Sequence, residues 1–180
     1  MFKKFDPSSD VSTSTQVKSS VQRALKSQML EAHPALTEDI LEVLLPKKSP
    51  LVQYKVGPHL MLYCRHVEHE DRIPTDVPVL FQHRDGPILP SLKLVHKYPT
   101  LELKRATVDK GAIPFILGGA NIMCPGLTNP GSEMPPDGLT KDAQGFDVPG
   151  LSKGDGVVIY AEGKGHAIAI AVMSMSSAEM

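Results

Sequence analysis

The stretch Val108–Leu127, VDKGAIPFILGGANIMCPGL, decides how the second half of this 180-residue chain folds. Its apolar residues recur at helical spacing, and one helix face is expected to hold Ala112, Ile113, Ile116 and Leu117. Gly118-Gly119 ends this helix, because glycine readily adopts a positive φ and leaves the backbone uncovered. We expect a short β-prone segment at Asn121–Met123 and a turn at Pro125-Gly126. Such bare backbone predicts either a packing turn or a surface that a phosphate chain approaches closely.

Composition indicates a globular chain without an overall charge signature for nucleic acid. Apolar residues make up 41% of the sequence and the net charge is −1 at pH 7, which suits one domain or two small ones. Sixteen prolines and fourteen glycines predict many turns and short strands. The absence of Trp argues against a base-stacking sheet, and the near-neutral charge means that RNA contact depends on local basic patches.

The cysteines and the start of the chain bear on its cellular compartment. Cys64 and Cys124 are the only cysteines and stand far apart, so they predict neither a zinc ribbon nor a disulfide framework and suit a reducing cytosol. The first residues, MFKKF, lack the apolar run of a signal peptide, and no stretch is long enough to span a membrane. We therefore expect a cytoplasmic protein with no membrane partner.

Charged residues are segregated along the chain, with acidic clusters at 68–76 and 133–147. This segregation predicts either one basic face or scattered solvated charge. Lys47-Lys48 follows a predicted helix, where cations complement the helix dipole or contact phosphate. The candidate residues of a basic face are Lys3, Lys4, Lys18, Arg23, Lys26, Lys47, Lys48 and Lys97.

Hydrophobic periodicity predicts an α+β domain over residues 1–97. The inner face of its first helix is expected to hold Val17, Val21, Ala24, Leu25 and Met29. Thr37 is the predicted N-cap of the second helix, and Pro90 or Ser91 begins the third. The expected elements are an edge strand at 2–5, a loop at 6–15, helices at 16–33, 37–45 and 90–96, strands at 51–56, 59–67 and 77–83, a charged loop at 68–76 and a turn at 84–87.

A second domain is predicted over residues 98–180, with strands at 101–108, 157–161 and 167–173. In the last strand large residues alternate with alanines, which fits a small, tightly curved barrel. Residues at about 132–148 are rich in Pro, Gly and Asp and are expected to form a flexible surface insertion. Ser177-Ala178-Glu179 predicts the start of a helix.

Several motifs of the second domain resemble a PUA domain, the small RNA-binding barrel named after pseudouridine synthase and archaeosine transglycosylase. The opening of such a domain is matched by Lys110–Ala112, Gly119–Met123 and Pro125–Leu127. Its later strands are matched by Lys153–Val158, Ala161–Gly163 and Ala169–Val172. The resemblance implies that this half of the chain is a PUA-type β-barrel.

Motifs of the first half make the resemblance more specific. Met1–Asp6, Pro46–Lys48, Arg84–Pro87 and His96–Pro99 are similar to segments of the malignant T-cell-amplified sequence family, called translation machinery-associated protein in fungi. The resemblance covers nearly the whole chain, with the motifs in order. In this family the barrel continues through a helix to a closing strand, so we expect this barrel to be incomplete at its C-terminal end.

The resemblance implies a binding site and a set of partners. The residues that match the region where PUA domains approach RNA are Lys110, Gly118, Gly119, Ala120, Asn121, Met123, Pro125 and Gly126. It further implies docking of the first domain on the small ribosomal subunit and its rRNA through the basic face, and binding of a tRNA acceptor end by the second. Family members act in a heterodimer with density-regulated protein and promote reinitiation, unconventional initiation and tRNA release in ribosome recycling.

Catalytic and cofactor signatures are not expected to explain this chain. His66 and His69 lie three residues apart at the end of a strand without an evident third ligand, which argues against a metal site. The chain contains no Gly-x-Ser-x-Gly, P-loop or His-Glu-x-x-His pattern, and Cys124 has no base nearby in sequence. We therefore expect a protein that is not an enzyme and needs no cofactor. The alternatives are the RNA-targeting subunit of an RNA-modification or ribosome-biogenesis complex, and a plain protein-interaction module.

Overall fold

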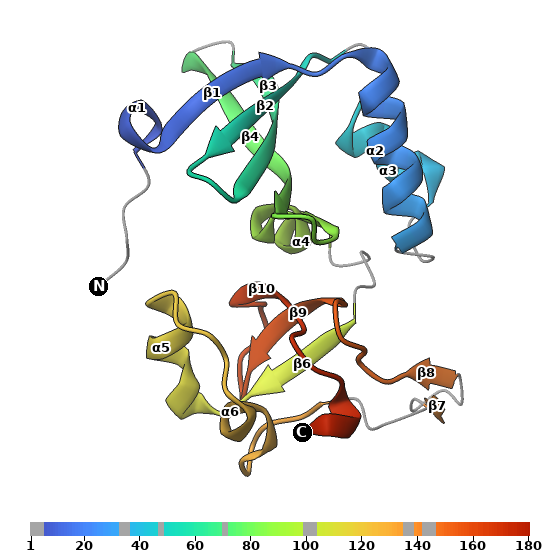
Figure 1. Cartoon of the computed structure of the whole chain (residues 1–180), viewed down its shortest axis with the longest axis vertical. Coiled ribbons are helices and arrows are strands. Elements are labelled where there is room, and N and C mark those ends of the chain that lie inside the picture. The colour runs from blue at the N-terminus through green and yellow to red at the C-terminus, as the bar shows by residue number, and fades with distance from the viewer. Residues whose placement is uncertain are drawn as a thin grey trace. The chain divides into compact units, whose positions relative to one another are not determined.

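The structure, a computed structural model, describes residues 6–32, 37–46, 49–69, 72–98, 104–134, 139–141 and 147–180. This part of the chain divides into two compact units (Figure 1). Elements α1 to α4 belong to the first unit, and elements β6 to η2 belong to the second. Helices and mixed sheets together make an α+β protein, which confirms the predicted fold class.

The first unit combines helices with a five-stranded sheet. Its elements are α1 Pro7–Asp10, β1 Val11–Gln16, α2 Ser19–Ala32, α3 Glu38–Leu44, β2 Leu51–Val56, β3 Leu60–His69, β4 Arg72–His83, β5 Ile88–Pro90 and α4 Leu92–Lys97. The strands follow one another in the order β1-β2-β3-β4-β5, and every neighbouring pair is antiparallel.

The core of the first unit lies between the sheet and helices α2 and α3. Leu25 and Met29 of α2 are buried in one cluster with Leu41 of α3 and with Leu51 and Leu80 of the sheet. Each such side chain contributes about 1.5 to 3 kcal/mol by leaving water. The cluster therefore holds the two helices against one face of the sheet.

Local capping signals of this unit are where the sequence predicts them. The Thr37 side chain accepts a hydrogen bond from the Ile40 N–H at the start of α3, and Ser91 does the same for Leu94 at the start of α4. Each cap satisfies an amide that has no partner within the helix. The hairpin of β2 and β3 is also confirmed, with Tyr54 opposite Leu62.

Two predicted loops of the first unit are wrong. Residues 6–15 form α1, which Asp6 caps, and most of β1, because their Val and Thr side chains suit an edge strand that pairs with β2. The predicted charged loop at 68–76 is largely strand, because β3 extends to His69 and β4 begins at Arg72.

The inner face of α2 also differs from the prediction. Leu25 and Met29 are buried as expected, whereas Ala24 is exposed and Val21 is 42% exposed. The helix begins only at Ser19, because β1 continues to Gln16, and the face it turns toward α3 carries Gln22 and Lys26. The predicted edge strand at 2–5 lies outside the described residues.

The second unit contains a three-stranded sheet with short helical segments around it. Its elements are β6 Arg105–Val108, η1 Lys110–Ala112, α5 Ile113–Leu117, α6 Cys124–Thr128, β7 Leu139–Lys141, β8 Asp147–Pro149, β9 Gly156–Ala161, β10 Ala169–Val172 and η2 Ser177–Glu179. The order is β10-β9-β6, with β6 parallel and β10 antiparallel to the central strand. Strands β7 and β8 pair separately, within the segment predicted as an insertion.

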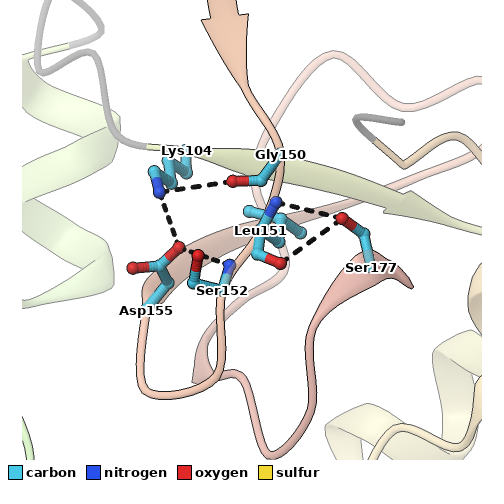
Figure 2. Close-up of polar contacts among 6 residues, drawn as sticks. All are labelled: Lys104, Gly150, Leu151, Ser152, Asp155 and Ser177. Carbon is cyan, nitrogen blue, oxygen red and sulfur yellow. Dashed lines mark hydrogen bonds and ion pairs between the residues drawn. The ribbon is translucent and has the colours of Figure 1, made fainter. Parts of the chain in front are cut away.

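Polar contacts join the loop before β9 to the strand β6 and to the tail of the chain (Figure 2). The Lys104 ammonium donates to Asp155 Oδ2 at 2.6 Å, and that carboxylate also accepts from the Ser152 N–H at 2.7 Å. The buried Ser177 hydroxyl donates to the Leu151 carbonyl and accepts from its N–H. Leu151 is thereby held in the core of the unit, where it is 2% exposed.

Two predictions for this unit are wrong: one predicted strand is absent from the described residues, and one predicted turn is part of a helix. Residues Asn121–Met123 form no strand but connect α5 to α6. Pro125 and Gly126 lie inside α6, since proline fits the first turn of a helix, where its missing N–H is not needed. The predicted helix start near Ser177 is confirmed as η2, with a capping box between Ser176 and Glu179.

Candidate nucleic-acid interface

The candidate interface begins where a carboxylate turns the chain after β6. Asp109 Oδ1 accepts from the Gly111 N–H at 2.6 Å and from the Ala112 N–H at 3.2 Å, and so caps η1. Helix α5 follows and ends at Gly118, and Gly119 adopts a φ of +84°. That left-handed conformation favours glycine, so the Gly118-Gly119 pair has the role at the helix end that the sequence predicts.

From Gly118 to Asn121 the segment after α5 presents backbone and short side chains to solvent. Gly118, Gly119, Ala120 and Asn121 are all exposed, as is Pro125. The segment is anchored by Ile122, and α5 is anchored by Ile113 and Ile116. All three side chains pack against the core of the second unit. We call the exposed segment from Gly118 to Met123 the glycine segment.

Three consecutive amides of the glycine segment are unused. The N–H groups of Asn121, Ile122 and Met123 donate to no acceptor within the part of the chain that the structure describes. By contrast, the Gly119 and Ala120 amides bond to carbonyls of α5, at 2.9 and 3.0 Å. Unpaired backbone donors on a surface are suited to bind phosphate oxygens, which accept hydrogen bonds without regard to base sequence.

Lys110 is brought close to the other end of the candidate interface. The Asp109 N–H donates to the Gly126 carbonyl at 3.3 Å, and a Cβ added to Gly126 would lie 3.5 Å from that of Ala112. The Lys110 side chain is 65% exposed, and its ammonium lies 3.8 Å from Glu162 Oε1. A carboxylate therefore accompanies the cation, and it weakens the positive field at this point.

Large apolar side chains are exposed on α5 and the glycine segment, which the sequence analysis did not predict. Phe115 is 67% exposed, Met123 is 69% exposed and Leu117, expected on the inner face, is 38% exposed. Helix α5 lies at the margin of the second unit (Figure 1), so only one of its faces meets the core. The sequence did contain a signal for this exposure. The residues from Ile113 to Leu117 are all apolar, and a helix this short can bury only one of its faces.

The candidate basic residues of the first unit have different environments. Lys18 and Arg23 are exposed on or beside α2, and Lys97 is exposed in the last turn of α4 with its ammonium 5.4 Å from the Tyr98 ring centre. Lys26 is only 17% exposed and donates to Glu42 at 2.8 Å, so its charge is neutralised within the fold. Lys3, Lys4, Lys47 and Lys48 lie outside the described residues.

A polar cluster on β2, β3 and β4 is a second group of interacting titratable side chains in the first unit. Asp76 accepts from the Tyr54 hydroxyl and lies 2.8 Å from His66 Nδ1. Hydrogen bonds from Tyr54 and then His66 lower the pKa of Asp76. Burial raises the pKa of the nearby Cys64 thiol to about 12, which makes it a poor nucleophile.

Metal-binding side chains do not gather in the same described ranges. These ranges hold no group of three His, Cys, Asp or Glu side chains placed to bind a metal ion. Cys124 is half-buried, with its sulfur 3.7 Å from that of Met175. None of the helices described is long and apolar enough to cross a membrane.

Comparison with known proteins defines the class of the chain. Residues 5–99 match the pre-PUA-like domain family and residues 104–180 match the PUA domain family. A hypothetical protein of Pyrococcus horikoshii superposes with a TM-score of 0.58 at 20% identity, over 93% of this chain and 85% of that one. A PUA domain from Aeropyrum pernix gives a TM-score of 0.55 at 20% identity, over 93% and 75%. The chain is thus a protein with a pre-PUA domain followed by a PUA domain.

Relatives in eukaryotes identify the family. Translation machinery-associated protein 20 of Schizosaccharomyces pombe is 41% identical over 100% of this chain and 86% of its own length. Malignant T-cell-amplified sequence 2 of Homo sapiens is 39% identical with the same coverage, and the Drosophila melanogaster homologue of malignant T-cell-amplified sequence 1 is also 39% identical. The chain belongs to the malignant T-cell-amplified sequence and translation machinery-associated protein family.

Proposed function

We propose that this protein is a non-catalytic translation factor that holds the acceptor end of a tRNA on the small ribosomal subunit. Its PUA domain contacts the RNA backbone, and its pre-PUA domain docks on rRNA. In this role it promotes reinitiation and the release of tRNA during ribosome recycling. It works in the cytoplasm by positioning molecules, and it makes and breaks no covalent bond.

The observation that carries the proposal is the open glycine segment. The amides of Asn121, Ile122 and Met123, which are unpaired within the described residues, offer donors to phosphate oxygens, and the side chains from Gly118 to Ala120 are too small to block them. Lys110 adds an exposed cation, whose ammonium lies 3.8 Å from Glu162, and the neighbouring Asp109 amide bonds to the Gly126 carbonyl. The translation role is supported by the names of relatives such as translation machinery-associated protein 20.

Docking of the first unit is proposed to use the cations that remain available for phosphate. Lys18, Arg23 and Lys97 are exposed. Lys3, Lys4, Lys47 and Lys48 remain candidate cations from the sequence and lie outside the described residues. Lys26 is left out because its ammonium is paired with Glu42. Two weak electrostatic contacts in one chain raise the effective concentration of the second contact once the first has formed.

The partner chain is proposed to be density-regulated protein, in a heterodimer. The exposed apolar side chains of Phe115, Leu117 and Met123 support a protein contact near the glycine segment, because exposed large apolar side chains lose unfavourable contact with water when a partner covers them. RNA and the partner protein would therefore bind next to each other, at the glycine segment and α5. Backbone amides meet RNA, and apolar side chains meet the partner.

The direct test is to place a negative charge on the glycine segment without straining its backbone. Ala120→Glu alters an exposed residue outside the regular elements, and Ala24→Glu makes the same change on an exposed residue of α2. We expect Ala120→Glu to weaken the binding of tRNA by roughly tenfold or more, since a carboxylate then faces the phosphates. Ala24→Glu should leave the affinity near that of the wild type. Binding is measured by fluorescence anisotropy at several salt concentrations.

A second measurement separates this function from its alternatives. Tagged protein is recovered from cell extract at low and high salt and scored for the small ribosomal subunit and for RNA-modifying enzymes. Salt-sensitive recovery of the subunit supports the proposal. Recovery of a modification enzyme without the subunit would replace it with a targeting role, and the absence of salt-sensitive RNA binding would leave only a protein-interaction module.

A further inference from the structure

Glu162 is a carboxylate at a point where the proposed RNA contact uses a cation. It follows β9 directly, and its N–H donates to the Val108 carbonyl at 2.9 Å, which holds its backbone against β6. Its Oε1 lies 3.8 Å from the ammonium of Lys110, the cation that we assign to RNA phosphate. An anion so close to that cation repels phosphate. The residue therefore lowers the affinity for a nucleic-acid backbone unless the same ligand also offers it a hydrogen-bond donor.

The Glu162 carboxylate is available to accept such a hydrogen bond. In the part of the chain that the structure describes it accepts none, and Lys110 at 3.8 Å lies beyond hydrogen-bonding distance. By contrast, the carboxylates of Asp109, Asp155 and Glu179 accept from backbone amides of the second unit. The Glu162 side chain is 40% exposed, so a ligand can reach it.

Gly131 leaves the space that the carboxylate occupies. A Cβ built on Gly131 would lie 2.6 Å from Glu162 Cδ and 2.6 Å from Oε2. A larger residue at this position would therefore push the carboxylate away from its present place. The φ of +92° at Gly131 also favours glycine. The carboxylate thus lies against bare backbone, close to the Lys110 ammonium.

RNA supplies a donor that suits this arrangement. In an RNA chain the 2′-hydroxyl is on the ribose carbon next to the one that carries the 3′-phosphate. A phosphate that pairs with Lys110 therefore brings a hydroxyl close to a carboxylate only 3.8 Å from that ammonium. The 2′-hydroxyl donates as well as accepts hydrogen bonds, and it is the group by which a protein tells RNA from DNA at a given contact. DNA would present the same phosphate without the donor.

We propose that Glu162 selects RNA over DNA by accepting a hydrogen bond from the 2′-hydroxyl of the nucleotide whose phosphate meets Lys110. The inference rests on the proposed RNA contact and adds a specificity-determining residue to it. The carboxylate repels the backbone of either nucleic acid, and the hydroxyl recovers part of that loss for RNA alone. Selectivity of this kind comes partly from a repulsive element directed against the wrong ligand.

The test measures how the contribution of a single hydroxyl depends on Glu162. The probe is a fluorescein-labelled RNA hairpin that reproduces the acceptor arm of a tRNA, and a DNA hairpin of the same sequence is compared with it. Further RNA hairpins carry one 2′-deoxy substitution each, placed in turn along the single-stranded end. Binding of the whole protein is measured by anisotropy at constant salt.

Three variants separate the acceptor from the charge. Glu162→Ala removes both, whereas Glu162→Gln keeps an acceptor oxygen without the charge. Glu133→Ala removes another exposed carboxylate of the second unit and is the matched control. The Glu162 side chain is partly exposed and its pair with Lys110 is screened by water, so the variants are expected to fold, and thermal unfolding checks this.

We expect one 2′-deoxy position to weaken binding of the wild type by roughly fivefold or more, since a hydrogen bond to a charged acceptor is lost. In Glu162→Ala the same substitution should cost nothing, and the preference for the RNA hairpin over the DNA hairpin should fall by a similar factor. RNA and DNA carry the same backbone charge, so this ratio cancels the general repulsion of phosphates by Glu162. Glu162→Gln should keep part of the preference, and Glu133→Ala should keep all of it.

Two results would overturn the inference and leave the proposed RNA contact in place. The first is that every 2′-deoxy substitution costs the same in Glu162→Ala as in the wild type, which would mean that no hydroxyl meets this carboxylate. The second is an equal loss of preference in Glu133→Ala, which would indicate a general effect of charge. If neither hairpin binds, or if Ala120→Glu binds the RNA hairpin as the wild type does, the proposed function fails and this inference fails with it.

Discussion

The ammonium of Lys110 lies 3.8 Å from Glu162 Oε1, so the cation proposed to meet RNA has an anion beside it. Both side chains are well exposed, at 65% and 40%. Water screens such a pair, and its contribution to stability is about 0 to 1 kcal/mol. The carboxylate matters more for binding, because it faces the same approaching phosphates with the opposite sign.

Removal of this carboxylate is therefore expected to strengthen RNA binding. In Glu162→Gln the affinity for tRNA should rise by a few-fold at low salt, and the difference should shrink as salt screens the charge. Lys110→Gln should have the opposite effect and reduce the salt slope by about 1. The measurement is anisotropy of labelled tRNA over a salt series. Glu133→Gln, at another exposed carboxylate of the second unit, serves as the control. Equal affinities for Glu162→Gln and the wild type would contradict the prediction.

The ion pair of Lys104 and Asp155 is expected to contribute to the stability of the second unit. The Asp155 carboxylate accepts from both Lys104 and the Ser152 N–H (Figure 2), and its side chain is 26% exposed. Asp155→Ala should reduce the free energy of unfolding by about 1.5 to 3 kcal/mol, the range for hydrogen bonds to charged groups. Urea unfolding measures this, with the exposed Lys153→Ala as control. A change no larger than that of the control would mean that the pair does not stabilise the unit.

Exposed apolar residues of α5 are expected to bind the partner without supporting the fold. Phe115→Ser should weaken binding to density-regulated protein at least tenfold, because large aromatic residues dominate interface energies. The thermal stability should change little, since the side chain is already 67% exposed. Val21→Ser makes a similar change at an exposed apolar residue of the first unit. Calorimetric titration of both variants checks the prediction, and equal affinities would rule out α5 as the contact.

Features determined by neighbouring residues were predictable from the sequence. The caps Thr37 and Ser91, the turn at Arg84–Pro87 and the helix end at Gly118-Gly119 all depend on residues within a few positions. The errors have a different origin. Residues 11–16 form a strand because β2 offers a partner to a segment whose Val and Thr side chains suit an edge strand, although the richness in Ser and Thr alone predicts a loop.

The candidate site shows the same division. The exposure of the glycine segment follows from its own composition. Two ion pairs could not be predicted from local patterns, because their partners are far apart in sequence. Lys26 pairs with Glu42, 16 positions away, and Lys110 pairs with Glu162, 52 positions away.

The Asp76 cluster makes the stability of the first unit sensitive to acid. Hydrogen bonds from the Tyr54 hydroxyl and from His66 stabilise the ionised carboxylate, and the pKa of Asp76 is lower in the folded state than in the unfolded chain. The folded state therefore binds fewer protons than the unfolded state near the ordinary aspartate pKa of about 3.9. The stabilisation is complete well above that pH and is lost as the pH falls through the folded pKa.

Asp76→Asn should remove this part of the acid sensitivity. An amide has no charge to lose, so the free energy of unfolding of the variant should fall less steeply than that of the wild type below about pH 4. At pH 7 the variant should be less stable by about 1 to 3 kcal/mol, because the hydroxyl and imidazole lose an ionised acceptor. Urea unfolding of both proteins across the acid range measures the two slopes. Asp85→Asn, at an exposed carboxylate in the turn before β5, should keep the slope of the wild type. Parallel curves for Asp76→Asn and the wild type would show that Asp76 is not held in its ionised form by the fold.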